Sequence, residues 1–248
     1  MPDKLFFGEK EAYRQVMPAV GGRNSTFYVA QGQSTNATVG IKTPGKPSEH
    51  YLFCGYVLSP RQIAEIYEKE AAILGLLNSK AVVSFVDVNV QSPNDFFIAT
   101  EYMDGGNLDM LEGRISKPNA KILEVRLQEA LREIHKEGII HRDVNPSNIL
   151  ATKEAKKALY GNLSYNISGY INVIKLADFG IAMVLACSSP PVCLKKWELK
   201  MNFDQPPKYS GKFELSTCGT PGFSSFGKFD GDFSALENTM RYLTTPTP

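Results

Sequence analysis

Several features that mark specialised classes of protein are missing from this chain. No stretch approaches the roughly eighteen uninterrupted apolar residues of a transmembrane helix, so we expect no membrane span. The N-terminus has no basic region followed by a long apolar core, so we expect no secretory signal. The four cysteines follow no C-x-x-C spacing, and we expect free thiols in the reducing interior of a cell, in the cytoplasm or nucleus.

Charge of one sign is also lacking. The chain has 27 basic and 26 acidic residues, a formal net charge of +1, so nothing indicates a surface for nucleic acid or for an anionic membrane. Hydrophobic residues make up 43% of the 248 positions and charged residues 21%, an ordinary globular composition. This length predicts one large domain or a closely packed pair of lobes.

The most informative segment reads His-Arg-Asp-Val-Asn-Pro-Ser-Asn, at residues 141–148. A second, Lys-Leu-Ala-Asp-Phe-Gly, lies at residues 175–180. Phosphoryl transfer needs one carboxylate to orient a hydroxyl, and an amide with a second carboxylate to hold magnesium against the phosphates. Each segment adjoins a short apolar run typical of a strand, and the two together are hard to obtain by chance.

These two segments resemble the H-R-D and D-F-G motifs of eukaryotic-type protein kinases. The resemblance covers about residues 15–243 and implies an α+β, bilobal protein-kinase-like fold. Residues 1–103 would form a small β-rich N-lobe with the hinge, and residues 104–248 a mostly helical, shortened C-lobe. It also implies two cofactors, ATP and Mg²⁺.

Hydrophobic periodicity places the expected elements. We expect strands at 27–30, 37–42 and 96–100, a strand pair at 81–83 and 85–88, and helices at 61–78, 121–137 and 233–243. A polar connection at 152–169 is expected to be weakly helical before it becomes rich in Asn, Ser and Gly.

Two further motifs support the resemblance in the N-terminal half. Val-Gly-Ile-Lys resembles the kinase V-A-I-K, which makes Lys42 the lysine that contacts the nucleotide phosphates, and Glu70 its helix partner. The run at 101–108 resembles the hinge between lobes, where Glu101 and Met103 would bond the adenine edge through their backbones. Asn107 would lie near the ribose.

Within the H-R-D and D-F-G segments, the resemblance implies a division of roles. Asp143 would accept or orient the proton of the acceptor hydroxyl. Asn148 and Asp178 would be the magnesium ligands, since their oxygen donors suit a hard cation. His141 is expected to pack and hydrogen-bond within the loop.

Three departures from the family pattern bear on activity. Of the three glycines expected in the phosphate-covering loop only Gly22 is present, and Ser25 replaces the last. Asn145 stands where Ser/Thr kinases usually have a lysine, so it can hydrogen-bond a phosphate but cannot neutralise it. Ser-Ser-Phe-Gly at 224–227 replaces A-P-E, and the chain ends soon after, as expected of either a naturally trimmed kinase or a fragment of a longer protein.

A mobile regulatory segment is expected from Gly180 to Gly219. Arg142 resembles the arginine that binds a phosphorylated activation segment, and Ser216 and Thr217 lie where the activating phosphate usually sits. Thr220, in a Gly-Thr-Pro-Gly-Phe run, resembles part of the loop that seats the acceptor residue.

The shortened C-lobe leads to an expectation about partners. The last helix carries an apolar stripe that the family covers with helices this chain lacks, comprising Phe233, Leu236, Met240 and Leu243. We expect this stripe to be covered by a partner protein, by self-association, or by the chain's own loops through Trp197 and Phe203.

The favoured function is therefore ATP- and magnesium-dependent phosphoryl transfer to Ser or Thr hydroxyls of a protein substrate, in signalling. A non-catalytic kinase-fold module, or pseudokinase, is the first alternative. A kinase-fold phosphotransferase for small molecules is the second.

Overall fold

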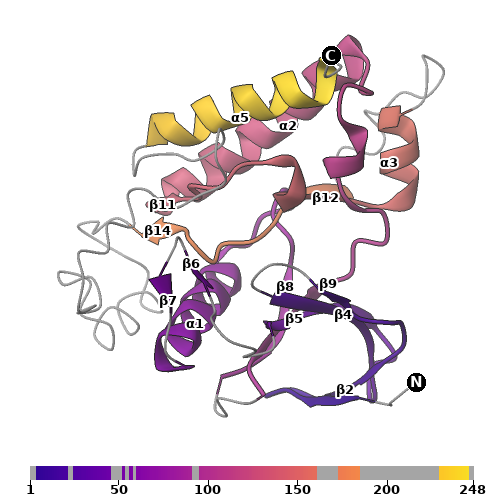
Figure 1. Ribbon diagram of the computed structural model, residues 1–248, viewed down its shortest axis with the longest axis vertical. Helices are drawn as coiled ribbons and strands as arrows, with labels where there is room; N and C mark the ends of the chain where they lie inside the picture. The colour runs from indigo at the N-terminus through magenta and orange to yellow at the C-terminus, as the bar shows by residue number, and fades with distance from the viewer. Residues whose placement is uncertain are drawn as a thin grey trace. The chain divides into compact units, whose positions relative to one another are not determined.

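The computed structural model describes residues 4–21, 25–45, 52–53, 56–57, 60–90, 95–160, 173–184 and 229–245 (Figure 1). The chain divides into two compact units. The first consists of Met1–Gly75 and Ser84–Tyr102, and the second of Leu76–Val83 and Met103–Pro248.

An antiparallel sheet forms most of the first unit, in the order β1-β2-β4-β5-β9-β8, with β3 paired to β4. Its strands are β1 (Leu5–Phe7), β2 (Ala12–Gln15), β3 (Val20–Gly21), β4 (Ser25–Gly32), β5 (Thr38–Pro44), β8 (Phe85–Asn89) and β9 (Phe97–Glu101). A separate hairpin joins β6 (Leu52–Phe53) to β7 (Tyr56–Val57). The expected strands at 27–30, 37–42 and 96–100 are confirmed. The strands β1 to β3 are additional, and each is too short to give a periodic signal.

The apolar core of this unit lies on one face of the sheet. Because successive residues of a strand point to opposite faces, Tyr28 and Ala30 of β4 share a face with Val39 and Ile41 of β5. The core on this face also takes in residues of β1, β2 and β9: Phe6, Tyr13, Phe97 and Ala99. The opposite face, which carries Lys42, is left for other contacts.

Asp87 on β8 fastens the turn between β1 and β2. Its buried carboxylate accepts hydrogen bonds from the backbone N–H of Glu9 (3.1 Å) and Lys10 (3.0 Å) and from the Tyr13 hydroxyl (2.9 Å). Gly8 is needed in this turn, because a Cβ there would lie 2.1 Å from Asp87 Oδ2. Burial, reinforced by this bond to Asp87, raises the pKa of the Tyr13 hydroxyl. These bonds link β8, at one edge of the sheet, to the turn that follows β1 at the other edge.

Helix α1 (Pro60–Leu76) confirms the helix expected at 61–78. Tyr67, Glu70, Ala71 and Leu74 are buried at the spacing of one helical face. Glu70 is the exception on this otherwise apolar face.

Residues 81–83 were expected to form a strand pair with 85–88, and this is wrong. Val82 belongs to the second unit and forms a parallel bridge with Leu176 of the same unit. The Leu176 N–H donates to the Ala81 carbonyl (2.8 Å). Ser84 alone separates the two segments, and a hairpin needs at least two connecting residues.

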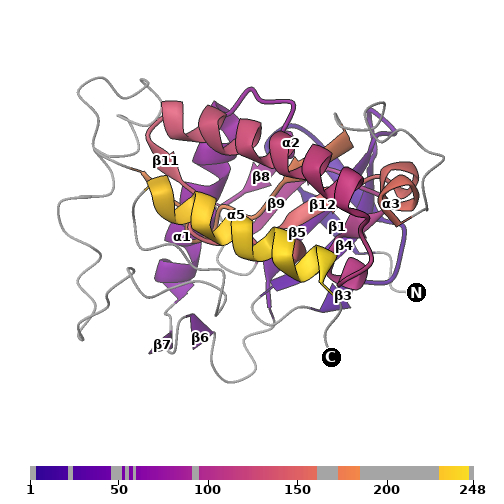
Figure 2. The same ribbon diagram turned by 90° about the horizontal axis from the view of Figure 1, so that it is seen from above.

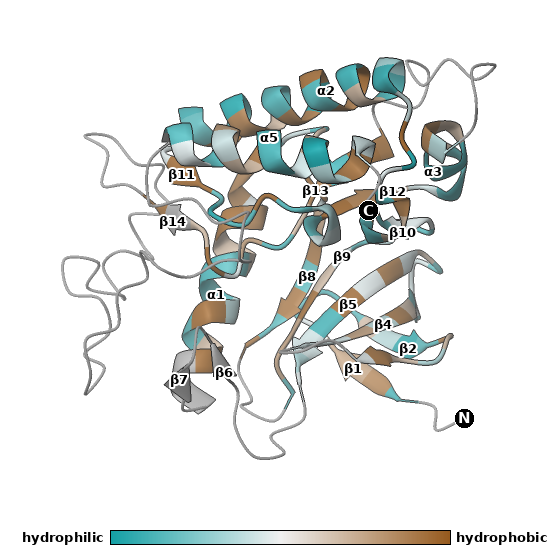
Figure 3. Cartoon of the chain, turned by 45° about the horizontal axis from the view of Figure 1, so that its top comes forward, coloured by the Kyte–Doolittle hydropathy of each residue, from teal (hydrophilic) through white to brown (hydrophobic). Residues whose placement is uncertain are grey.

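Two long helices, α2 (Lys117–Lys136) and α5 (Phe229–Thr244), pack side by side in the second unit (Figure 2). The helix expected from Lys121 starts at Lys117, because Ser116 caps it by accepting a hydrogen bond from the Asn119 N–H. Hydrophobic and hydrophilic residues alternate along both helices (Figure 3).

The apolar stripe of α5, expected to be covered by a partner, by self-association or by loops, packs in part against α2. Leu236 and Leu243 are buried, and the Phe233 ring contacts His135 of α2 edge-on. Helix α2 therefore supplies cover that the sequence analysis assigned to missing helices. The proposed partner for this stripe stays a prediction. Trp197 and Phe203, named as residues that could cover it, lie outside the described residues.

Short elements before and between these helices carry the catalytic motifs or lie beside them. A three-stranded sheet contains β10 (Gly106–Asn107), β12 (Ile149–Ala151) and β13 (Ile174–Leu176), and β11 (Ile139–Ile140) pairs with β14 (Met183–Val184). The remaining elements are two 3₁₀ turns, η1 (Asp109–Leu111) and η2 (Pro146–Asn148), and helix α3 (Lys153–Tyr160). Among the described helices, none has the length and apolar character to cross a membrane.

Candidate active site

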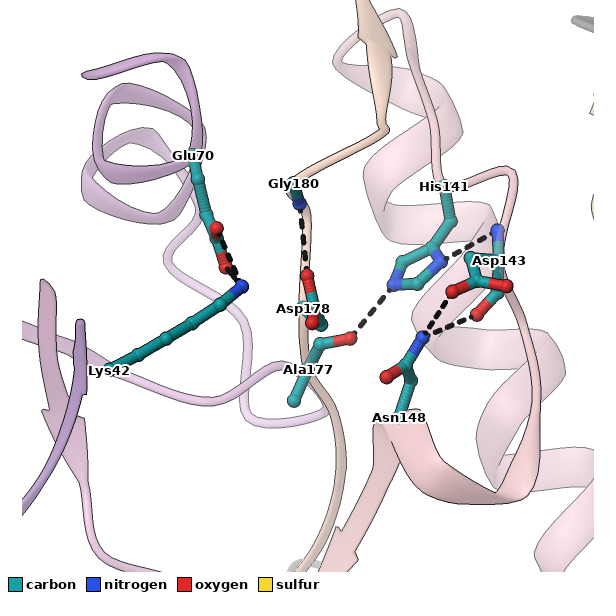
Figure 4. A network of polar contacts seen from close by, with 8 residues as sticks. All are labelled: Lys42, Glu70, His141, Asp143, Asn148, Ala177, Asp178 and Gly180. Carbon is teal, nitrogen blue, oxygen red and sulfur yellow. Dashed lines mark hydrogen bonds and ion pairs between the residues drawn. The ribbon is translucent and has the colours of Figure 1, made fainter. Parts of the chain in front are cut away.

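Lys42 and Glu70 form an ion pair within the first unit (Figure 4). Lys42 lies in β5, and its Nζ is 2.9 and 3.0 Å from the two carboxylate oxygens of Glu70 on α1. The side chain of Lys42 is 22% exposed, whereas that of Glu70 is 3% exposed. A buried carboxylate needs such a cation, and the ammonium is the less buried of the two groups. The Tyr67 ring lies 5.8 Å from the same Nζ, at cation–π range.

Asp143 is held in the second unit by Asn148 (Figure 4). The Asn148 Nδ2 donates to both the carboxylate Oδ2 and the backbone carbonyl of Asp143, each at 2.9 Å. Asn148 belongs to η2, immediately before β12, and is buried. These bonds fix the Asp143 carboxylate and leave the amide oxygen of Asn148 as its atom for a cation.

The D-F-G segment is tied to this loop through backbone atoms (Figure 4). The Ala177 N–H donates to the Asn148 carbonyl (2.8 Å), and His141 Nε2 lies 3.0 Å from the Ala177 carbonyl. Asp178 follows directly with a left-handed φ of 63°, and its Oδ1 accepts a bond from the Gly180 N–H (3.1 Å). Phe179 is buried with its ring against His141. His141 thus packs and bonds as expected.

Asn148 and Asp178 suit magnesium by their chemistry. One amide oxygen and one carboxylate, on adjoining and hydrogen-bonded segments, are hard oxygen donors of the kind Mg²⁺ takes alongside phosphate and water. Among the described residues there is no group of three or more His, Cys, Asp or Glu that could hold a metal alone.

Helix α5 anchors the same loop, a feature that the sequence analysis missed. Asp232 is fully buried and accepts hydrogen bonds from the backbone N–H groups of His141 (2.7 Å) and Arg142 (2.8 Å). The His135 Nε2 lies 2.9 Å from the same carboxylate. Thr239 lies seven residues further along α5, and its hydroxyl donates to the Val144 carbonyl (2.9 Å). The sequence shows only an Asp at the start of an apolar helix, and this does not by itself predict a bond to the loop.

Asn145 is used by the loop itself. Its Oδ1 accepts a bond from the Ser147 N–H (2.9 Å) and caps η2, and its Nδ2 donates to the Asp143 carbonyl (3.2 Å). The residue is 3% exposed. Both amide atoms thus bond to the loop backbone, so a contact with phosphate would require them to exchange partners.

The expected hinge residues lie at the ends of the two units. In the first, Glu101 ends β9, its carboxylate accepts from the Ser84 N–H (2.6 Å), and its carbonyl accepts from the Thr100 hydroxyl (3.3 Å). In the second, the carbonyl of the buried Met103 accepts from the Gly106 N–H (2.9 Å). Asn107 in β10 bonds to Asp109. Their contacts with adenine and ribose stay predictions.

Arg142 is almost completely buried, at 1% exposure, and adopts a left-handed φ of 71°. Its Nε and Nη2 have no hydrogen-bond partner within the part of the chain that the structure describes. Burial lowers the pKa of the guanidinium, and the charge of Asp232 opposes that effect. Such a cation favours an anion close by.

Several predicted site residues lie outside the described residues: Gly22, Ser216, Thr217 and Thr220. Ser25 is described, and begins β4 opposite Pro44 of β5. Its predicted contact with phosphate stays a prediction.

Comparison with known proteins gives a consistent result. The model of the protein kinase domain family matches residues 20–207. Serine/threonine-protein kinase cds1 of Schizosaccharomyces pombe is 32% identical over 130 residues, which cover 51% of this chain and 24% of that protein. A probable serine/threonine-protein kinase of Clostridium perfringens is 33% identical over 179 residues, 71% of this chain and 22% of that protein.

A third relative, serine/threonine-protein kinase ppk18 of Schizosaccharomyces pombe, is 28% identical over 213 residues, 85% of this chain and 14% of that protein. The chain thus spans no more than 24% of the length of these three relatives. The family match covers most of the chain, including the Lys42–Glu70 pair and the two catalytic motifs. The α+β architecture agrees with it, and this chain belongs to the protein kinase family.

Proposed function

We propose that this chain transfers the γ-phosphoryl group of ATP to Ser or Thr hydroxyls of a protein substrate, in a magnesium-dependent reaction. The observation that carries the proposal is the link between the two motifs of the second unit. Asn148 holds the Asp143 carboxylate through its side chain, and receives the Ala177 N–H beside Asp178 on its backbone. One residue thereby sets both the group for the acceptor and the group for the metal.

Asp143 acts on the acceptor hydroxyl. Its Oδ2 is fixed by Asn148, so the carboxylate can orient the hydroxyl and take its proton as the oxygen attacks phosphorus. A bond forms between that oxygen and the γ-phosphorus, the bond to the bridging oxygen of ADP breaks, and the ADP oxygen leaves with the electron pair. The carboxylate later releases the proton to solvent.

Lys42, Asn148 and Asp178 act on the phosphates. Lys42 presents a cation whose position is set by Glu70, and it would bind oxygens of the nucleotide phosphates. Magnesium, when bound, neutralises charge that develops on the transferring group. Asn148 and Asp178 would hold that ion through one oxygen each.

A non-catalytic kinase-fold module is the second candidate. It is favoured by Asn145, whose amide bonds to the loop backbone in the place where a lysine would neutralise phosphate charge. Transition-state stabilisation would then be weaker than in a kinase that has the lysine. Binding of Mg-ATP without turnover is the outcome that this candidate predicts.

Incubation of the chain with Mg-ATP and generic protein acceptors tests both candidates. Phosphoserine or phosphothreonine on the acceptor, abolished by a chelator and by Asp143→Asn, supports the kinase. Binding of Mg-ATP with no transfer, even after long incubation, supports the non-catalytic module. Absence of any nucleotide binding overturns both.

Regulation by phosphate in the segment after D-F-G is part of the same proposal. Arg142 supplies a buried cation with donors that no described residue bonds. A phosphate on Ser216 or Thr217 would provide the anion through charge-assisted hydrogen bonds. Mass spectrometry after incubation with Mg-ATP is the test. Phosphate on other positions but never on these two would remove the regulatory claim.

A further inference from the structure

Helix α3 lies in the connection between β12 and β13, which runs from residue 152 to residue 173. Two antiparallel neighbours such as β12 and β13 can be joined by a turn of two residues, so α3 is not needed to form their sheet. The helix buries Ala155, Ala158 and Leu159 at helical spacing. Its other residues bond to the post-hinge turn, the segment at 104–107 that follows the expected hinge.

Contacts at both ends hold α3 in place. At its start, the Asp104 carboxylate of the post-hinge turn accepts a hydrogen bond from the Lys153 N–H (2.9 Å). At its end, the Asn119 side chain donates to the carbonyls of Ala158 (3.0 Å) and Leu159 (3.4 Å). Asn119 belongs to α2 and is buried. Helix α3 is therefore fixed to the post-hinge turn at one end and to α2 at the other.

Lys156 makes the strongest link between α3 and the post-hinge turn. Its Nζ donates to the carbonyls of Gly105 (3.1 Å) and Asn107. Hydrogen bonds from a charged donor are stronger than those between neutral groups. The Gly105 N–H also donates to the Ala151 carbonyl (3.0 Å), and a Cβ on Gly105 would lie 2.5 Å from the Thr152 carbonyl. The turn thus lies directly against the backbone that leads into α3.

Hydrogen bonds continue from Asn107 to the catalytic loop. Asn107 Nδ2 lies 3.4 Å from Asp109 Oδ2, and the same carboxylate oxygen accepts a bond from the Ser147 hydroxyl (2.6 Å). Ser147 precedes Asn148 in η2. An Asn amide carries two N–H donors, and the bond to Asp109 uses one of them. The position of Asn107 therefore depends on α3 through its backbone and on the catalytic loop through its side chain.

We propose that Lys156 is a positioning residue for nucleotide binding, which holds the post-hinge turn so that Asn107 can bond the ribose hydroxyls. The inference rests on the proposed function and on the predicted contact of Asn107 with the ribose. Lys156 bonds the backbone carbonyls of the turn, so it acts through Asn107 and not on the ligand itself. Without the ammonium, two carbonyls lose a charged donor and the turn is less firmly held to α3.

The test compares Mg-ATP with magnesium 2′,3′-dideoxy-ATP, which lacks both ribose hydroxyls. Calorimetry gives the two dissociation constants, and their ratio measures the contribution of the hydroxyls. Lys156→Met removes the ammonium with little change in helix propensity, and should lower this ratio by about three- to thirtyfold. Lys156→Gln provides the same test if the Met variant does not fold. Lys157→Met is the matched control, because Lys157 is the next residue of α3 and is exposed, and it should leave the ratio unchanged.

A double variant shows whether Lys156 acts through Asn107. Asn107→Ala keeps the backbone carbonyl that Lys156 bonds but removes the amide, so it should lower the ratio by itself. Adding Lys156→Met to this variant should then lower the ratio no further. General damage to the fold would weaken both ligands equally and leave the ratio as in the wild type.

The outcomes distinguish this inference from the proposed function. Wild-type protein that binds neither nucleotide overturns the proposed function, and the inference with it. Wild-type protein that binds both nucleotides equally well overturns the inference alone, because Asn107 then has no contact with the hydroxyls. An unchanged ratio in Lys156→Met, or a further fall of the ratio in the double variant, also overturns the inference alone. A lowered ratio in Lys156→Met that the Asn107→Ala background removes supports it.

Discussion

Asp232 offers the sharpest test of how the catalytic loop is held. It lies on α5 far along the chain from the loop, yet its carboxylate bonds the backbone N–H groups of His141 and Arg142 at 2.7 and 2.8 Å. We predict that Asp232→Ala lowers both stability and turnover, although Asp232 is not placed to touch substrate in the proposed reaction.

The magnitude follows from the groups that the substitution strands. Two buried N–H donors would lose their acceptor, at a cost of about 1–3 kcal/mol each. Loss of the contact with His135 adds to this, so about 3–5 kcal/mol of unfolding free energy should be lost after partial relaxation. A domain of this kind has about 5–15 kcal/mol in total, so the variant should remain folded only near ordinary temperatures.

Urea unfolding measures the change, with Glu237→Ala as the matched control. Glu237 is on the same helix, but its ion pair with Arg241 is exposed, with side chains 66% and 71% accessible. Exposed pairs contribute about 0.2–1 kcal/mol, so the control should lose little. Equal losses from the two substitutions would refute the anchoring argument. A retained fold with normal turnover in Asp232→Ala would refute it as well.

Three further substitutions test the roles assigned to the site. Lys42→Met should abolish turnover while the protein stays folded, and Lys42→Arg should retain more nucleotide binding, as measured by calorimetry; full phosphorylation by the Met variant would remove this role. Asp143→Asn should leave Mg-ATP affinity nearly intact but reduce turnover roughly a hundred- to ten-thousandfold, whereas Asp178→Ala should weaken magnesium-dependent binding; equal effects on binding would contradict the division. Asn145→Ala should lower the melting temperature by about 2–4 °C per kcal/mol lost, and lower kcat with little change in KM for ATP. An unchanged melting temperature with a raised KM would instead indicate a direct contact with phosphate.

Local patterns predicted the parts of this site that depend on residues close together in the chain. The H-R-D and D-F-G segments could be read because each motif keeps its spacing within a few residues. Lys42 and Glu70 were identified from their resemblance to the family's strand lysine and its helix glutamate, and the structure brings them to 2.9 Å. The short strand β1 gave no such signal, since three residues cannot show a period.

Contacts between distant segments could not be obtained in the same way. Nothing in the sequence near Asp232 or Thr239 indicates that both bond to the catalytic loop, because that depends on how α5 packs along α2. Asp87 is a similar case, where a carboxylate inside a strand holds a turn near the N-terminus. The apolar stripe of α5 is another case. Its periodicity indicated burial, but the sequence did not reveal that α2 is the element that covers it.

Departures from a family pattern were the hardest to interpret, because each was weighed alone. Gly40, where the family's V-A-I-K has alanine, weakens a strand when it is considered without Phe27 of β4. The register of β4 and β5 makes them neighbours, and the volume that one gains is the volume that the other gives up. Asn145 is a similar case. It stands where Ser/Thr kinases usually have a lysine, and its amide bonds to the Asp143 carbonyl and to the Ser147 N–H. A departure therefore has to be judged together with the residue that packs or bonds against it.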